Sequence, residues 1–125
     1  MACAIRSPQE LCQNFETVVD ISAGYTAWTM YKLDDTVVIN KATAAYGATA
    51  VLYYNIPKVV VDCETVSLGN LTQYGVGSKV YFKAATNAVT PTSSGNTLCG
   101  IVTKVPAVAA TTVEIHLDGT LGITS

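Results

Sequence analysis

The fold of this chain is decided between Gly77 and Gly119, where the sequence reads GSKVYFKAATNAVTPTSSGNTLCGIVTKVPAVAATTVEIHLDG. Residues 79–83 form a β-favouring run, and a cluster of turn-forming residues occupies positions 91–96. Apolar and polar residues alternate over positions 113–118, which predicts a strand with one buried face. A chain built in this way holds a shape and offers surfaces, and no residue of the stretch is placed to carry out chemistry.

The rest of the chain has the same β character. Strand-like runs separated by turn-forming residues cover 17–21, 27–33, 36–40, 48–54, 59–61 and 98–105. We expect Asn55-Ile56-Pro57 to end the strand before it, because proline cannot donate to a central ladder. The total of about eight or nine short strands predicts an all-β fold, either a small β-barrel or a β-sandwich.

The first fifteen residues differ from the remainder. Residues 1–6 are predicted to form an arm. Ser7-Pro8-Gln9-Glu10 has the composition of a helix start, with an N-cap serine and a glutamate that completes a capping box. We expect a short helix here that places Leu11, Cys12 and Phe15 on one side. The chain thus divides into an arm with a short helix (1–15) and a single β domain (16–125).

The composition suggests a partner of some kind. Half of the 125 residues are apolar and 13% are charged, against about 25% charged in an average soluble domain. A domain of this size cannot bury so much apolar surface alone, so part of it is expected to face a partner, although abundant alanine accounts for some of the excess.

Charge and hydropathy exclude several classes of partner. The net charge is −2, Arg6 is the only arginine, and the lysines are scattered along the chain. This argues against binding to nucleic acid or to anionic lipid, since both need clustered basic residues. No apolar run is long enough to span a bilayer, and no signal peptide is evident, so we expect folding in the cytoplasm of the cell that makes the protein.

No enzyme class fits the sequence. The only histidine, His116, shares a strand face with Glu114 and Asp118, which could bind a metal ion but reads better as a solvated face. There is no nucleophile elbow and no phosphate-binding loop. We therefore predict no catalytic residue, no cofactor and no metal site. The cysteines lack a paired spacing and are expected to be reduced and mostly buried, at positions Cys3, Cys12, Cys63 and Cys99.

Aromatic residues leave one alternative open. Seven tyrosines and Trp28 could form a face that binds sugar or a protein partner, or they could simply occupy half-buried sheet positions. Tyr53 and Tyr54 must point to opposite faces of a strand, so at most one of them is expected in a core.

The order G-x-K-V-Y-F, polar turn, V-T, S-S-G-N-T, L-x-G-I-V, alanine-rich loop, T-V-E-I-x-L-D-G resembles a family of small bacteriophage proteins, some of which are capsid decoration (cement) proteins. The likeness covers roughly the last fifty residues. Asn14-Phe15 matches a pair with which family members open their first strand. The middle of the chain, residues 27–54, is rich in tyrosine and threonine where the family is rich in glycine.

The resemblance implies a structural virion protein that binds the major capsid protein on the outer capsid surface. It would bridge neighbouring subunits and stabilise the shell as a homo-oligomer, with a trimer favoured over a dimer. We expect the interface to include Ile5 and Arg6 of the arm, together with Leu11, Phe15 and Trp28. The alternative is a carbohydrate- or host-surface-binding β module of a phage tail or fibre, acting through the tyrosines.

Overall fold

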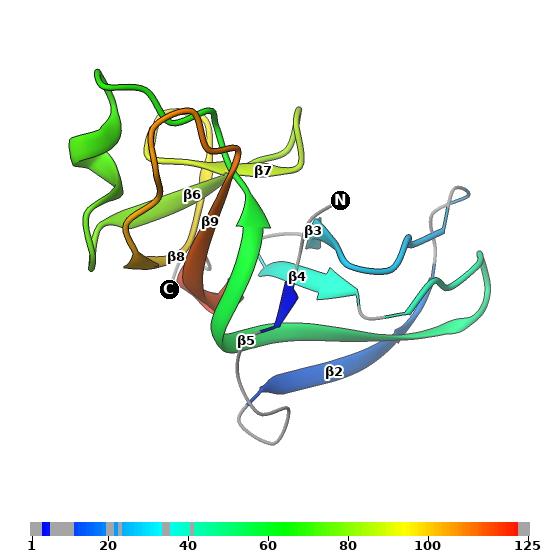
Figure 1. The fold of residues 1–125 in the computed structure, drawn as a ribbon. Coiled ribbons are helices and arrows are strands. Elements are labelled where there is room, and N and C mark those ends of the chain that lie inside the picture. Colours follow the sequence, from blue (N-terminus) through cyan, green and yellow to red (C-terminus); the bar gives the residue numbers. More distant parts are fainter. Residues whose placement is uncertain are drawn as a thin grey trace.

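The described strands form one antiparallel sheet that curls on itself (Figure 1). The computed structural model of the chain describes residues 4–5, 12–19, 22, 24–33, 36–40 and 42–122. The elements are β1 (Ala4–Ile5), β2 (Gln13–Val18), β3 (Thr29–Leu33), β4 (Thr36–Asn40), β5 (Thr49–Asp62), the 3₁₀ helix η2 (Leu71–Tyr74), β6 (Lys79–Lys83), β7 (Ala88–Thr90), β8 (Thr97–Lys104), β9 (Thr112–Asp118) and the 3₁₀ helix η3 (Gly119–Gly122). The predicted all-β fold is confirmed, and the barrel is the form it takes. In these ranges no helix has the length and apolar character needed to cross a membrane.

The barrel is built by β5 and the strands that follow it in the chain. Its strands follow the order β5-β9-β8-β6-β7, and a parallel bridge between Cys63 and Val89 brings the end of β5 back to β7, so that the barrel nearly closes. The predicted inward face of β9 is confirmed, because Val113, Ile115 and Leu117 are all buried.

Strand β5 connects the barrel to a second part of the sheet. Its first half pairs with β2 on one edge and with β4 on the other, and its second half pairs with β1 and β9. The expectation that Pro57 ends a strand is wrong. The register with β9 shifts between Ile56 and Val59, and this bulge leaves Pro57 at a position where no N–H has to be donated. The strand therefore continues and bends through the bulge (Figure 1).

The sheet has a hydrophobic cluster on each face. The main core fills the barrel and reaches Met30, Ile39 and Tyr53 on the inner face of β3, β4 and β5. A second cluster covers the opposite face of these strands, with Val19, Tyr25, Val38, Ala44, Ala50 and Leu52. Of Tyr53 and Tyr54, only Tyr53 is buried in a core, as expected, whereas Tyr54 is partly buried and packs against the second cluster.

The N-terminal region is more extended than predicted. Gln13, Asn14 and Phe15 lie in β2 and pair with β5, so the short helix does not extend through Phe15 as expected. Pairing with a long central strand outweighs the weak propensity of so short a helix. Ala4 and Ile5 of the predicted arm form β1 on the edge of β5. The Ser7–Glu10 helix start lies outside the described residues.

Burial raises the pKa of two cysteine thiols. The pKa of Cys63 rises to about 11, mainly because burial disfavours the thiolate; a side-chain hydrogen bond with Tyr74 opposes the rise, and the charges of Asp62 and Glu64 add to it. Burial alone raises the pKa of Cys99 to about 12. Both thiols are therefore protonated at neutral pH and behave as small apolar groups in the core.

These shifts predict how stability depends on pH. The thiolate forms more readily in the unfolded chain, where the cysteine pKa is 9.0, so the stabilisation is complete below pH 9 and is lost as the pH rises toward 11. Urea unfolding between pH 7.5 and 10.5 should show this decline, with a shallower slope in a Cys63→Ala/Cys99→Ala double variant. Equal slopes in the two proteins would assign the decline to other groups.

Candidate functional site: an uncharged end of the barrel

Two segments at one end of the barrel carry no charged side chain. They are residues 65–78, which include η2, and residues 105–113, which comprise the β8–β9 loop and the first two residues of β9; neither segment contains Asp, Glu, Lys, Arg or His. Both segments lie on the side of the barrel away from β2, β3 and β4 (Figure 1). We call these two segments the uncharged end.

Backbone hydrogen bonds join the two segments. The N–H of Val66 donates to the carbonyl of Ala110 (2.9 Å), and the N–H of Ala109 donates to the carbonyl of Val66 (2.7 Å). The N–H of Gly77 donates to the carbonyl of Val102 in β8 (2.8 Å). The uncharged end is thus one connected surface that is fixed to the barrel.

Large apolar side chains on this surface face solvent. Leu68 is 81% exposed and Val76 is 69% exposed, while Val105 and Val108 are each 49% exposed. Leu68 and Val76 are the two most exposed large apolar residues among those described. Single exposed apolar residues are ordinary, but several on one uncharged surface are typical of a protein-binding site, since charged residues are depleted at interface cores.

The loop that presents Leu68 is held rigidly. The Asn70 side chain accepts a hydrogen bond from the N–H of Ser67 (2.7 Å) and donates one to the carbonyl of Thr65 (3.2 Å). Tyr74 is fully buried beneath this loop, and its hydroxyl donates to the carbonyl of Glu64 (2.9 Å). A side chain on a rigid loop loses little entropy on binding, which favours its use as an anchor.

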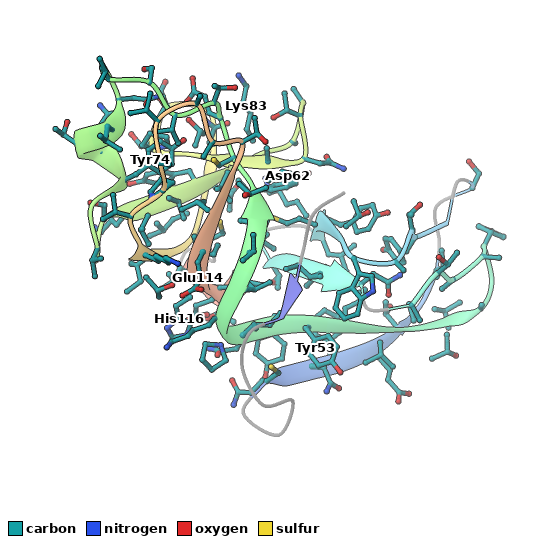
Figure 2. The ribbon with its side chains drawn as sticks, viewed as in Figure 1. Tyr53, Asp62, Tyr74, Lys83, Glu114 and His116 are labelled. Atoms are coloured by element: carbon teal, nitrogen blue, oxygen red, sulfur yellow. The ribbon has the colours of Figure 1, made fainter. Side chains whose placement is uncertain are left out.

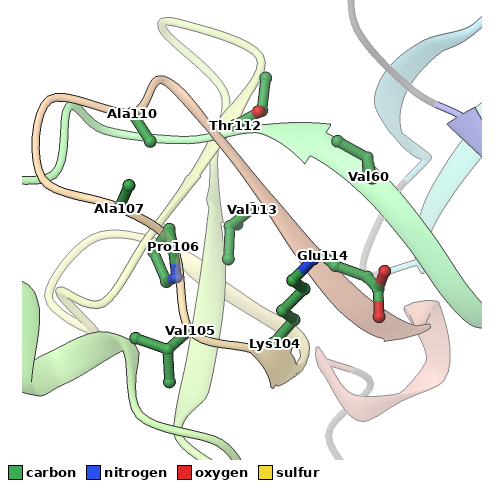
Figure 3. A pocket seen from close by; sticks show the side chains of 9 residues that line it. All are labelled: Val60, Lys104, Val105, Pro106, Ala107, Ala110, Thr112, Val113 and Glu114. Atoms are coloured by element: carbon green, nitrogen blue, oxygen red, sulfur yellow. The ribbon is translucent and has the colours of Figure 1, made fainter.

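A groove of about 720 Å³ adjoins the uncharged end (Figure 3). It lies between the β8–β9 loop and the neighbouring strands β9 and β5, and its apolar lining comes from Val60, Val105, Pro106, Ala107, Ala110 and Val113. Lys104 and Glu114 lie together at one end of it. The Glu114 carboxylate accepts a hydrogen bond from the Thr103 hydroxyl at 3.0 Å. The groove suits an apolar side chain of a binding partner. A polar residue next to that side chain would then contact Lys104 and Glu114.

The stripe of Glu114, His116 and Asp118 does not form a metal site in the described part of the chain. All three side chains are partly buried on the outer face of β9, where Glu114 and His116 project on one side (Figure 2). Across the described ranges, no group of three or more His, Cys, Asp or Glu residues could hold a metal ion. The His116 Nε2 atom is buried and has no hydrogen-bond partner.

A smaller pocket of about 190 Å³ lies beside Cys63, Glu64 and Lys83. The thiol there is a poor nucleophile because burial keeps it protonated. The Glu64 carboxylate accepts a hydrogen bond from the Thr90 hydroxyl at 2.7 Å, which ties β7 to the end of β5. Glu64 and Thr90 therefore help to close the barrel.

The structure describes three of the interface residues predicted from sequence. Ile5 is in β1, and Arg6 and Leu11 fall outside the described residues. Phe15 is partly buried against the second cluster, with its ring 5.8 Å from that of Tyr54. Trp28 packs partly buried on the main core at a backbone φ of 60°. Ile5, Phe15 and Trp28 lie outside the uncharged end.

The tyrosines are dispersed over the fold. Tyr25, Tyr53 and Tyr74 are buried, Tyr31, Tyr54 and Tyr81 are partly buried, and Tyr46 is exposed. They occupy both faces of the sheet and both of its parts, so that they serve the cores more than any one surface.

Sequence reasoning missed Leu68, Val76, Val105 and Val108. Their signal was the absence of charge over residues 65–78 and 105–113, and this signal had meaning only once the two segments were known to be neighbours.

Comparisons with protein-family models, with curated proteins and with solved structures found no match to this chain.

Proposed function

We propose that this protein is a structural component of a phage virion that binds the outer surface of the capsid and stabilises it by bridging major capsid subunits. The observation that carries the proposal is the uncharged end, where Leu68, Val76, Val105 and Val108 are exposed on a rigid barrel. The resemblance of residues 77–119 to decoration proteins supplies the identity of the partner.

The physical role follows from binding to the assembled shell. A protein that binds the assembled capsid, and not its separated subunits, stabilises the assembly by mass action, and many copies multiply the effect. A nearly closed antiparallel barrel suits this role because most of its strand edges are paired. The resemblance further implies that the protein acts as a homotrimer.

Quantitative mass spectrometry of purified virions tests the proposal directly. The expected result is a ratio of this chain to the major capsid protein near one or near a simple fraction such as one-third. A handful of copies per particle would instead identify a tail or fibre component, and absence from the particle would refute a virion role.

The contact surface is tested by one substitution. Leu68→Asp is expected to weaken capsid binding at least tenfold, because it places a charge at the centre of an apolar contact. Folding should change little, since the side chain is almost fully exposed. Binding to capsids that lack the protein can be measured by co-sedimentation, with urea unfolding as the check on folding.

The matched control is Leu121→Asp, which changes a 44% exposed leucine in η3, outside the uncharged end. Binding should be retained in this variant. If the two variants lose binding equally, the uncharged end is not the specific contact.

A further inference from the structure

The part of the sheet outside the barrel has two open edges. Its strands run in the order β2-β5-β4-β3, and among the described residues no strand pairs with the outer edge of β2 or with the outer edge of β3. Open strand edges present unpaired N–H and C=O groups and are templates for another strand. A proline, which would block such pairing, is absent from both strands.

The backbone of β2 shows which residues face outward. The N–H of Val19 donates to Ala48 (2.9 Å) and its carbonyl accepts from Gly47 (2.9 Å), so both groups of Val19 point toward the β5 side. Because the direction alternates along an antiparallel strand, Glu16 and Val18 direct their backbone groups toward the open edge.

The same reasoning applies to β3. Leu33 pairs with Thr36 with only two residues between them, and such a pair exchanges both backbone hydrogen bonds across its turn. Leu33 and Tyr31 are therefore bonded to β4, and Met30 and Lys32 direct their backbone groups outward. The two edges thus offer complementary rows of donors and acceptors.

The side chains agree with one antiparallel register between the two edges. When Glu16 of one copy lies opposite Lys32 of another, both are outward-facing residues and their charges are opposite. The same register places Phe15 opposite Leu33 and Thr17 opposite Tyr31. Glu16 and Lys32 are exposed, and their side chains lie on the same face of the sheet as those of Tyr53 and Ile39.

The apolar pairs fit the other face. Phe15, Tyr31 and Leu33 all pack only partly buried against the second cluster, on the edges of the same sheet face. Joining β2 to β3 of another copy would extend this cluster from one subunit into the next and cover the exposed remainder of each side chain.

We propose that β2 of one copy pairs with β3 of a second copy in the antiparallel register that sets Glu16 opposite Lys32. This contact uses two different surfaces, so repeated addition either closes a ring or continues as a filament. A self-pairing of β2 centred on Glu16 would place two like charges opposite each other and is disfavoured. The inference concerns the purified chain and stands apart from capsid binding.

Charge exchange tests the register. Native mass spectrometry of the purified protein should show oligomers of this chain. Glu16→Lys and Lys32→Glu should each shift the population to monomer by setting like charges opposite each other. The Glu16→Lys/Lys32→Glu double variant should restore the oligomers. Lys79→Glu, at an exposed position of a strand paired on both edges, is the control and should leave the mass unchanged.

Three outcomes overturn the proposal: a monomeric wild-type chain, single variants that assemble as well as the wild type, or a double variant that stays monomeric. If the chain is monomeric and still attaches to the virion, the β2–β3 contact is refuted while the proposal of capsid binding stands.

Covalent trapping provides the second test. In the proposed register the Cα atoms of residues 16 and 32 of two copies lie about 5.5 Å apart, which a disulfide can bridge. A Glu16→Cys/Lys32→Cys variant should form covalent oligomers under mild oxidation, and neither single variant should do so. If the double-cysteine variant formed disulfides only with other proteins and none between two copies of this chain, self-pairing would be contradicted.

Discussion

Replacing Gly119 with alanine should lower the free energy of unfolding by about 3 kcal/mol, because backbone atoms occupy the space that a side chain would need. A Cβ built on Gly119 overlaps the carbonyl oxygen of Val37 in β4, and neither backbone segment can rotate away. The contact joins η3 to β4 and so fastens the barrel to the other part of the sheet. Urea unfolding followed by the fluorescence of Trp28, the only tryptophan, measures the loss.

Gly69→Ala is the matched control for this substitution. Gly69 lies in the uncharged end, where the atom nearest to an added Cβ is the Ser67 hydroxyl at 3.6 Å, an ordinary contact. Its unfolding free energy should stay within about 0.5 kcal/mol of the parent. Equal losses in both variants would mean that the close approach at Val37 is not the cause. Gly100→Ala should behave like Gly119→Ala, because its Cβ would overlap the carbonyl oxygen of His116.

Tyr74→Ala is expected to cost about 4 kcal/mol, since the aromatic ring is fully buried in the main core and leaves a large cavity. Tyr74→Phe keeps the ring and removes only the hydroxyl that donates to Glu64, so it should cost about 1 kcal/mol. Urea unfolding measures both values.

The two Tyr74 variants also distinguish an effect on stability from an effect on the position of the Leu68 side chain. The ring lies beneath the loop that carries Leu68, so Tyr74→Ala should weaken capsid binding even under conditions where the variant is folded, whereas Tyr74→Phe should bind almost normally. A folded Tyr74→Ala protein that binds at full strength would show that the rigidity of the loop does not matter to the contact.

Local patterns in the sequence identified most of the strands. The run T-V-V-I-N over 36–40, the run K-V-Y-F-K over 79–83 and the alternation over 113–118 all became strands, and the alternation over 113–118 also gave the predicted buried face. Each of these signals depends on side chains only a few residues apart, which is the range over which periodicity carries information. The placement of Met30 and Trp28 against one core and of Tyr31 and Leu33 against the other follows from the same alternation.

The features that failed depend on residues far apart in the chain. Pro57 would end an isolated strand, but pairing with β9 on one edge and with β1 on the other holds the chain extended through the bulge. The second cluster, against which Tyr54 packs, combines residues of β4 and β5 with residues of loops from elsewhere in the sequence. The uncharged end needs the hydrogen bonds of Val66 to Ala109 and Ala110 before its two segments become one surface. No pattern along the chain encodes these neighbours.

The position of β5 sets the order in which this protein can fold. Val61 pairs with Val113 and Ala4 pairs with Val60, so the central strand recruits partners from both ends of the described chain. The barrel cannot close around β5 until β9 has been synthesised, and β7 must still reach Cys63. Folding should therefore be slow and largely post-translational, with a single cooperative phase in stopped-flow refolding, as expected for sheets dominated by non-local pairing. A nascent chain held short of β9 would expose the apolar residues of β5 and depend on chaperones until release.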